Sequence, residues 1–315
     1  RIEVKTGSLN EEKNEEGLAH FIEHMAFNGT KKYPKNDLIK ILESKGVDFG
    51  NDLNAYTSFD KTVYMLDGQT KDLDDFLDIL HEWAFNVTFD KNETEKEKGV
   101  VIEEWRRNTG LNKEIQDFYQ KYLFSNSKYL ERLPIGLVPS IENFTREGAL
   151  KYYKKWYVPN NMIIYVAGDI KKPQETIKKI ENLFGNEKFS KLPNNEKFKT
   201  KKITNNDIFD IYQNDQAKFN SFTYLNMIPS VLPKNDLDKI KKEQISGLFN
   251  TIMHIRYAEK LNSLDTNIKD ISISENYLND YFGFQELSIE LKNDKEIEGI
   301  EEAFKEFNQI KKGIS

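Results

Sequence analysis

The stretch Gly17–Thr30 carries a His-x-x-Glu-His motif in an apolar setting, formed by His20, Glu23 and His24. The motif contains two of the four histidines of the chain. Apolar residues recur around it at helical spacing, which predicts a buried helix. On such a helix the two histidines lie one turn apart and the glutamate lies in the same sector. Two neutral imidazoles beside a carboxylate are typical of a zinc site that activates water.

A single helical histidine is usually an ordinary core or surface residue, but the order of this motif favours a metal. It inverts the common His-Glu-x-x-His zinc motif and matches the inverzincin signature. A catalytic zinc needs a third protein ligand. His81 lies in an amphipathic helix expected at Asp72–Phe85, and His254 lies in a long helix of a second region, so neither is suited. The third ligand is therefore expected on another helix.

The acidic helix expected at Glu93–Arg107 offers that ligand. Glu97 and Glu104 are seven residues apart, so they share a helical face, whereas Glu103 points about 100° away from Glu104. Charged helices are usually solvated. The apolar run at residues 99–102 nevertheless indicates that part of this helix is buried. Spacing alone does not decide which of Glu97, Glu103 and Glu104 is the third ligand.

Residues 17–30 and 97–107 together resemble the insulinase or pitrilysin-type (M16) zinc peptidases, in which a glutamate on a later helix completes a His-x-x-Glu-His site. Other stretches are also similar, most closely to the PqqL-like bacterial branch. They are Tyr33–Asp37, Asn54–Tyr64 and Glu131–Gly136. The resemblance covers nearly all of residues 1–190, with its motifs in the right order.

This resemblance implies roles for individual residues. It implies one Zn²⁺ per catalytic domain, with His20, His24 and Glu104 as ligands. Glu23 would be the general base, and Glu97 would be a catalytic carboxylate in the outer shell that supports the site. Glu103 remains an alternative third ligand, because the interval from His24 to Glu104 is slightly longer than in the best-known members. With two neutral ligands and one carboxylate, the site would carry a net charge of +1 and keep a position open for water.

A peptide-binding strand is expected beside this site. Residues Asn51–Asp67 alternate strand-forming and turn residues, which predicts a strand pair. An exposed strand edge can pair with an extended peptide through main-chain hydrogen bonds. The residues alone favour an ordinary hairpin with core aromatics. The resemblance implies that Asn54, Ala55 and Tyr56 form a substrate-binding edge.

The fold class expected is α+β: two related mixed α/β sandwich domains, mainly antiparallel sheet covered by helices, as in mitochondrial-processing-peptidase/LuxS-like metallohydrolases. The expected domains are residues 1–187 (catalytic, first strands missing), a linker at 188–202, and residues 203–315 (related, non-catalytic and incomplete). Expected strands are Ile2–Ser8, the 51–67 pair, Asn161–Ala167, Phe219–Ile228, Ile268–Ser274 and Phe282–Leu291. Further expected helices are Asn36–Lys45, Lys113–Phe124, Thr145–Trp156, Pro173–Phe184, Asp236–Leu261 and Glu296–Lys311.

Composition excludes some classes of function. The 315 residues include 46 basic and 52 acidic side chains, and no dense basic stretch marks nucleic acid as a partner. There are no cysteines, which excludes disulfides and thiolate zinc ligands. No run is apolar for long enough to span a membrane. No signal peptide is visible, so the compartment rests on the resemblance, which favours the bacterial cell envelope or periplasm over the cytoplasm.

Three functions follow. The first, implied by the resemblance, is a zinc-dependent endopeptidase acting on peptides or unfolded polypeptide segments. In the family a C-terminal half or a partner subunit completes such a chain and closes a chamber. The second is a catalytically silent scaffold subunit of the same fold, which would usually have lost the motif. The third is a small-molecule metallohydrolase or a structural zinc protein. A structural zinc normally has a fourth protein ligand, and none is evident.

Overall fold

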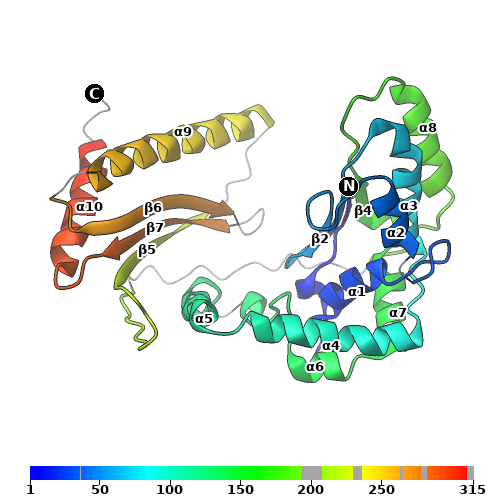
Figure 1. Cartoon of the computed structure of the whole chain (residues 1–315), viewed down its shortest axis with the longest axis horizontal. Helices are drawn as coiled ribbons and strands as arrows, with labels where there is room; N and C mark the ends of the chain where they lie inside the picture. Colours follow the sequence, from blue (N-terminus) through cyan, green and yellow to red (C-terminus); the bar gives the residue numbers. More distant parts are fainter. Residues whose placement is uncertain are drawn as a thin grey trace. The chain divides into compact units, whose positions relative to one another are not determined.

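A computed structural model describes residues 1–35, 37–125, 127–192, 208–229, 236–262, 265–277 and 282–310. The chain divides into two compact units, Arg1–Lys201 and Lys202–Ser315 (Figure 1). The linker expected at 188–202 lies largely outside the described residues. Among the described residues, no helix combines the length and the apolar character that a membrane span requires.

The first unit is built on a four-stranded antiparallel sheet in the order β2-β3-β1-β4. Its strands are β1 (Ile2–Val4), β2 (Leu53–Thr57), β3 (Thr62–Leu66) and β4 (Met162–Ile164). The central strand β3 is almost wholly buried, as its apolar sequence predicts. Strand β2 is at one end of the order, so one of its edges has no strand neighbour in this sheet.

The described part of the first unit contains eight α-helices. They are α1 (Leu18–Phe27), α2 (Asp37–Ser44), α3 (Leu73–Phe85), α4 (Lys91–Arg107), α5 (Leu111–Leu123), α6 (Val138–Glu142), α7 (Arg146–Trp156) and α8 (Pro173–Phe184). Helix α1 is central and contacts β2, β3, α4 and α7. Phe21 and Ile22 of α1 are completely buried. Burial on several sides explains why this helix is apolar over most of its surface.

Two expected strands are shorter in the structure than the sequence predicted. Strand β1 ends at Val4, because the chain then turns onto the loop between β2 and β3, where Ser8 N donates to Ser58 O at 3.2 Å. A short 3-10 helix, Ser8–Asn10, follows. Gly7 permits this approach, since a Cβ atom there would lie 2.3 Å from Ser58 O. Strand β4 is limited to three residues, matching the length of its only sheet partner, β1.

The second unit has a three-stranded antiparallel sheet in the order β5-β7-β6. Its elements are β5 (Ser221–Pro229), α9 (Asp236–Leu261), β6 (Ile268–Tyr277), β7 (Phe282–Leu291) and α10 (Glu296–Ile310). Met253 and Tyr257 of α9 and Ala303 of α10 share one core with alternate residues of β6 and β7. Both helices therefore cover the same face of this sheet. The expected α+β fold class, with antiparallel sheets covered by helices, is confirmed.

Candidate metal centre

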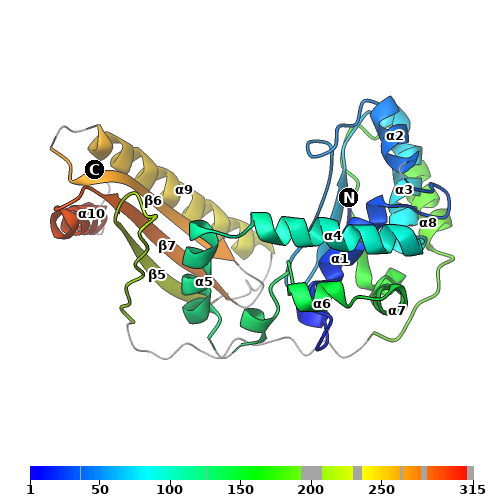
Figure 2. The same cartoon turned by 60° about the horizontal axis from the view of Figure 1, so that its bottom comes forward.

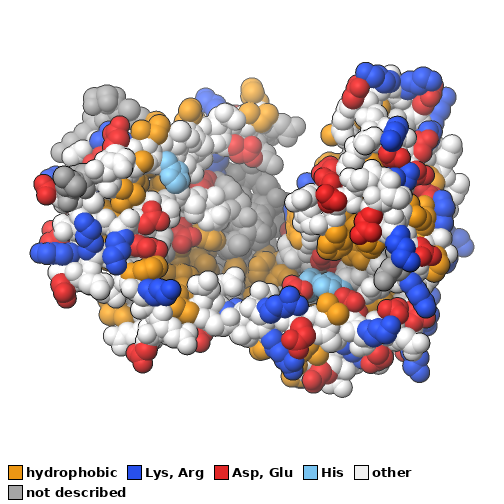
Figure 3. Space-filling model, in the orientation of Figure 1, with side chains coloured by type: hydrophobic (Ala, Val, Ile, Leu, Met, Phe, Trp, Pro, Cys, Tyr) orange, Lys and Arg blue, Asp and Glu red, His pale blue; other side chains and the backbone are white. Residues whose placement is uncertain are grey.

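Helix α1 places the three motif residues in one sector, as its periodicity predicted. The rings of His20 and His24 meet edge to face, with their centroids 4.6 Å apart. Glu23 is only 6% exposed, whereas both histidines are partly exposed. In Figure 3, histidine surface is visible in the region where Figure 1 draws α1, bordered by acidic and hydrophobic side chains.

Helix α4 runs beside α1 (Figure 2). Its Glu104 brings a carboxylate to the two rings. Glu104 Oε2 lies 3.3 Å from His24 Nε2 and 3.8 Å from His20 Nε2. A tetrahedral zinc about 2.1 Å from each donor would separate its ligands by about 3.4 Å. In the described part of the chain, these three residues form the one group of acidic, histidine or cysteine side chains spaced to hold a metal.

The other two glutamates of α4 take different positions. Glu103 forms an exposed ion pair with Arg106 and does not join the cluster. Glu97 Oε1 lies 2.7 Å from His24 Nδ1, and its Oε2 accepts a hydrogen bond of 2.5 Å from Asn28 Nδ2. Glu97 therefore holds the ring nitrogen of His24 that faces away from Glu104. A carboxylate in this position fixes the tautomer and the orientation of a metal-binding histidine.

The two histidines differ in their electrostatic surroundings. Burial and the neighbouring charge of His24 lower the pKa of His20 to about 4. Burial also opposes charge on His24, but hydrogen bonds with Glu104 and Glu97 outweigh it and raise the pKa of His24 to about 9. Glu97 and Glu104, the two carboxylates that favour a proton on His24, also favour the binding of a divalent cation. His20 Nδ1 is buried and has no hydrogen-bond partner in the described structure.

The donor set fits zinc. Two imidazole nitrogens and one carboxylate oxygen are ligands that Zn²⁺ accepts, and three protein ligands leave a position for water. Hydrogen bonding to His24 lowers the pKa of Glu104, despite partial burial. Burial acts to raise the pKa of Glu97, but its hydrogen bonds with His24 and Asn28 lower it. Both carboxylates are thus ionised at neutral pH, as ligation and support of a cation require.

Glu23 has an environment unlike that of the other carboxylates. Burial raises the pKa of Glu23 to about 7, although a hydrogen bond from Thr57 opposes this shift. Thr57 Oγ1 donates to Glu23 Oε2 over 2.6 Å. A carboxylate whose pKa lies near neutral can both take and return a proton efficiently at that pH.

The predicted substrate residues lie on the edge strand β2. Asn54 and Tyr56 are exposed, and Ala55 is partly buried against the core. The backbone N–H of Ala55 donates to Asn54 Oδ1 at 2.8 Å. That N–H is therefore satisfied by a side chain of its own strand. Residues 53, 55 and 57 face inward, as alternation along a strand requires.

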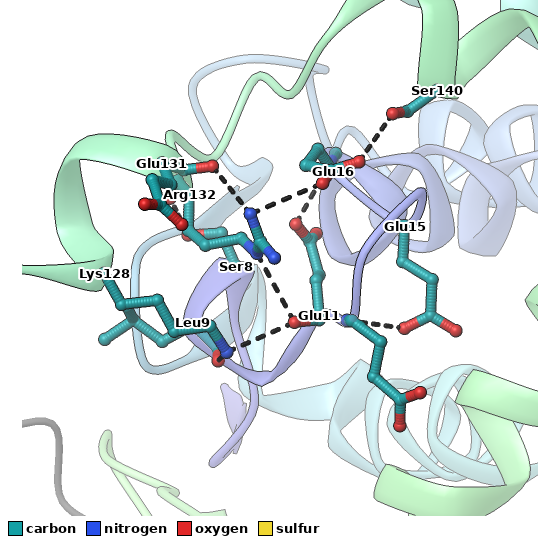
Figure 4. A network of polar contacts seen from close by, with 11 residues as sticks. Ser8, Leu9, Glu11, Glu15, Glu16, Lys128, Glu131, Arg132 and Ser140 are labelled. Carbon is teal, nitrogen blue, oxygen red and sulfur yellow. Dashed lines mark hydrogen bonds and ion pairs between the residues drawn. The ribbon is translucent and has the colours of Figure 1, made fainter.

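The amino end of α1 is held by a buried polar network (Figure 4). Gly17, at the N-cap of α1, has no side chain with which to cap the helix, and Glu11 does so instead. Its Oε2 accepts from Gly17 N at 3.0 Å and its Oε1 from Ala19 N at 2.9 Å. Burial raises the pKa of Glu11 to about 8, against the effect of these bonds and of Arg132. Glu11 therefore fixes the helix one residue before His20.

A segment more than 100 residues later completes this network. Arg132 Nε donates to the backbone oxygen of Glu11 at 3.4 Å, and its guanidinium pairs with Glu16 at 3.4 Å. Ser140 Oγ donates to the other oxygen of Glu16 at 2.6 Å. Lys128 Nζ donates to the backbone oxygen of Leu9 at 2.6 Å. The loop that leads into α1 is thus held in place by α6 and the segment that precedes it.

The helix-covered antiparallel fold and the inverted His-x-x-Glu-His helix together resemble the class of peptidase that the sequence predicted. The chain belongs to peptidase family M16. The family model for insulinase (peptidase family M16) matches residues 1–138, and the model for the peptidase M16 inactive domain matches residues 143–315. The second match begins before α7, so it includes β4, which pairs with β1 of the first unit. The family resemblance seen in the sequence is confirmed.

The relatives include bacterial zinc proteases. The chain is 35% identical over 269 residues to the probable zinc protease PqqL of Escherichia coli, covering 83% of the chain and 28% of that protein. It is 39% identical over 173 residues to the probable zinc protease PqqL of Haemophilus influenzae, covering 54% of the chain and 19% of that protein. The chain thus spans less than a third of the length of either relative.

Solved structures give the same assignment. The first half of the periplasmic protease PqqL from Escherichia coli superposes with a TM-score of 0.78 at 31% identity, covering 93% of this chain and 63% of that one. Pitrilysin superposes with a TM-score of 0.68 at 20% identity, covering 100% of this chain and 34% of that one, which supports the fold alone.

Proposed function

We propose that this chain is the zinc-binding part of a metalloendopeptidase that hydrolyses peptides or unfolded polypeptide segments. His20, His24 and Glu104 are the proposed ligands, and Glu23 is the proposed general base. One observation carries the proposal: the three ligand atoms lie within 4.8 Å of one another, on two packed helices, beside a buried carboxylate of the same motif. Residues 1–187 are the proposed catalytic domain and residues 203–315 a related, non-catalytic one.

The chemistry assigns a task to each side chain. Zinc, when bound, acidifies water and polarises the scissile carbonyl. Glu23 accepts the proton of the attacking water and delivers it to the leaving amine, a double role suited to a pKa near 7. Glu97 holds His24 in one tautomer and orientation through Nδ1. Burial keeps Glu23 away from bulk water, which would otherwise compete as a proton donor.

Peptide binding is assigned to the free edge of β2, at Asn54, Ala55 and Tyr56. Main-chain pairing on this edge gives affinity with little demand on the substrate sequence. The rest of the longer protein, or a partner subunit, is proposed to complete an enclosing chamber, because this chain covers only 28% of the Escherichia coli relative. A periplasmic or cell-envelope location is proposed from the periplasmic PqqL structure.

Replacing Ala55 by Pro tests the edge strand. Proline removes the N–H that now donates to Asn54 and is tolerated on edge strands. One lost hydrogen bond of about 0.5–1.5 kcal/mol predicts a rise in KM of roughly 3- to 10-fold, with kcat little changed. Ala55→Ser keeps the N–H and serves as the matched control. Equal KM values for the two variants in a peptide hydrolysis assay would contradict binding at this edge.

Metal analysis and peptide hydrolysis on the complete protein test the proposed function. We expect one zinc per catalytic domain, hydrolysis of a quenched fluorescent peptide mixture, loss of that activity with 1,10-phenanthroline, and recovery with added zinc. Absence of zinc would favour the scaffold alternative. Zinc without peptide hydrolysis would point to a structural zinc or to a small-molecule substrate.

A further inference from the structure

One hydroxyl group reaches the proposed general base from the proposed substrate strand. Thr57 is the last residue of β2, and its Oγ1 lies 2.6 Å from Glu23 Oε2. It faces inward with Leu53 and Ala55, whereas Asn54 and Tyr56 point to the exposed side. The same strand therefore offers its edge to solvent and one hydroxyl to the buried carboxylate on α1.

The hydrogen bonds around Thr57 indicate that its hydroxyl group donates to Glu23. The nearest alternative acceptor is Thr62 Oγ1, which is farther away at 3.4 Å. Thr62 itself donates to the backbone oxygen of Thr6 at 3.0 Å, so its own hydrogen is already committed. A hydroxyl has one hydrogen to donate. The short contact to a carboxylate oxygen is the stronger of the two bonds available to Thr57.

We propose that Thr57 is a positioning residue for catalysis, which holds one oxygen of Glu23 so that the carboxylate keeps a single orientation toward the reacting water. This inference rests on the proposed function. Glu23 has rotatable bonds of its own, and a carboxylate that turns away from the water loses proton-transfer geometry. The hydroxyl also makes the orientation of the base depend on β2. A peptide that pairs with the edge at Ala55 then orders the strand that holds the base.

A purely structural hydroxyl would behave differently. Such a role predicts that removing the hydroxyl lowers the stability of the α1–β2 contact and leaves turnover intact in the folded enzyme. A positioning role predicts a lower kcat at unchanged KM and unchanged zinc content. Loss of an outer-shell hydrogen bond in metal sites typically costs about 10- to 100-fold in activity. The split between kcat and KM therefore separates the two roles.

The test compares Thr57→Val, which keeps the shape, with Thr57→Ser, which keeps the hydroxyl, in the complete zinc-loaded protein. We expect kcat on a quenched fluorescent peptide to fall about 10- to 100-fold in T57V, with KM and zinc content unchanged. T57S is expected to stay within about threefold of the wild type. Ser58→Ala is the matched control, because the hydroxyl of Ser58 donates to Asp60 instead.

A T57V kcat within about twofold of the wild type would overturn the inference, as would an equal loss in T57V and T57S. A change confined to KM or to zinc content would overturn it too. If T57V does not fold, as judged by circular dichroism, Thr57→Ala is compared with T57S by the same criteria. A wild-type protein without zinc-dependent hydrolysis would instead refute the proposed function. The two failures are therefore distinguishable.

Discussion

Glu23→Gln is expected to bind zinc as the wild type does and to lose peptide hydrolysis. The amide has nearly the shape of the carboxylate and can still accept the hydrogen bond from Thr57. It cannot take a proton from water at neutral pH, so proton transfer to and from the base is lost. General acid–base catalysis typically contributes about 10²- to 10⁴-fold, and we expect kcat to fall by that factor. The three proposed ligands are not altered.

Two measurements on the same preparation check this expectation: zinc per chain by elemental analysis, and kcat on a quenched fluorescent peptide. Glu95→Gln is a matched control, because it makes the same change at an exposed position of α4 where the carboxylate pairs with Lys98 of the same helix. We expect that control to behave as the wild type. Full activity of the Glu23 variant with zinc still bound would show that another group activates water.

The local features of the site followed from the sequence because they depend on one helix. The sector shared by His20, Glu23 and His24 is a consequence of helical geometry and needs no information about the rest of the fold. Spacing also placed Glu97 and Glu104 on one face of α4. It did not decide which glutamate meets the histidines, because that depends on how α4 packs against α1. The family resemblance supplied this step.

Other residues that support the site could not be identified from local sequence patterns. Glu11 caps α1 from the preceding loop, six residues before Gly17, so no capping signature marks it. The only signal is indirect, since the glycine at the N-cap leaves the helix without a side-chain cap. Thr57 lies in the predicted strand pair, and Asn28 lies in the stretch that carries the histidine motif. Their roles depend on contacts of 34 and 69 residues in sequence separation, respectively.

The ends of the strands also depend on tertiary contacts that local sequence patterns do not reveal. The sequence predicted a strand at Ile2–Ser8, but pairing stops at Val4 because the backbone is redirected toward Ser58. The close approach at Gly7 is a tertiary contact, and only the glycine itself hints at it in the sequence. The longer helices were predicted well, because their 3.6-residue periodicity extends over eight or more residues. The five-residue helix α6 was not predicted.

Glu104→Gln is expected to weaken zinc binding by more than about 100-fold, since outer-shell partners alone are worth about 10- to 100-fold. The amide keeps the size of the side chain but removes the negative charge from a site whose other two ligands are neutral. His24 also loses the charged acceptor that, together with Glu97, raises its pKa. Competition with a chromophoric chelator at fixed pH measures the affinity, since ligand protonation competes with the metal.

Glu103→Gln provides the comparison that decides between the two adjacent glutamates. Its carboxylate is exposed and pairs with Arg106 on the surface, and such pairs contribute about 0–1 kcal/mol to stability. We therefore expect wild-type zinc affinity and activity in this variant. The opposite pattern, with zinc lost in E103Q and kept in E104Q, would make Glu103 the ligand and require α4 to be rotated by about 100° at this point. Zinc retained in both variants would mean that neither glutamate completes the site.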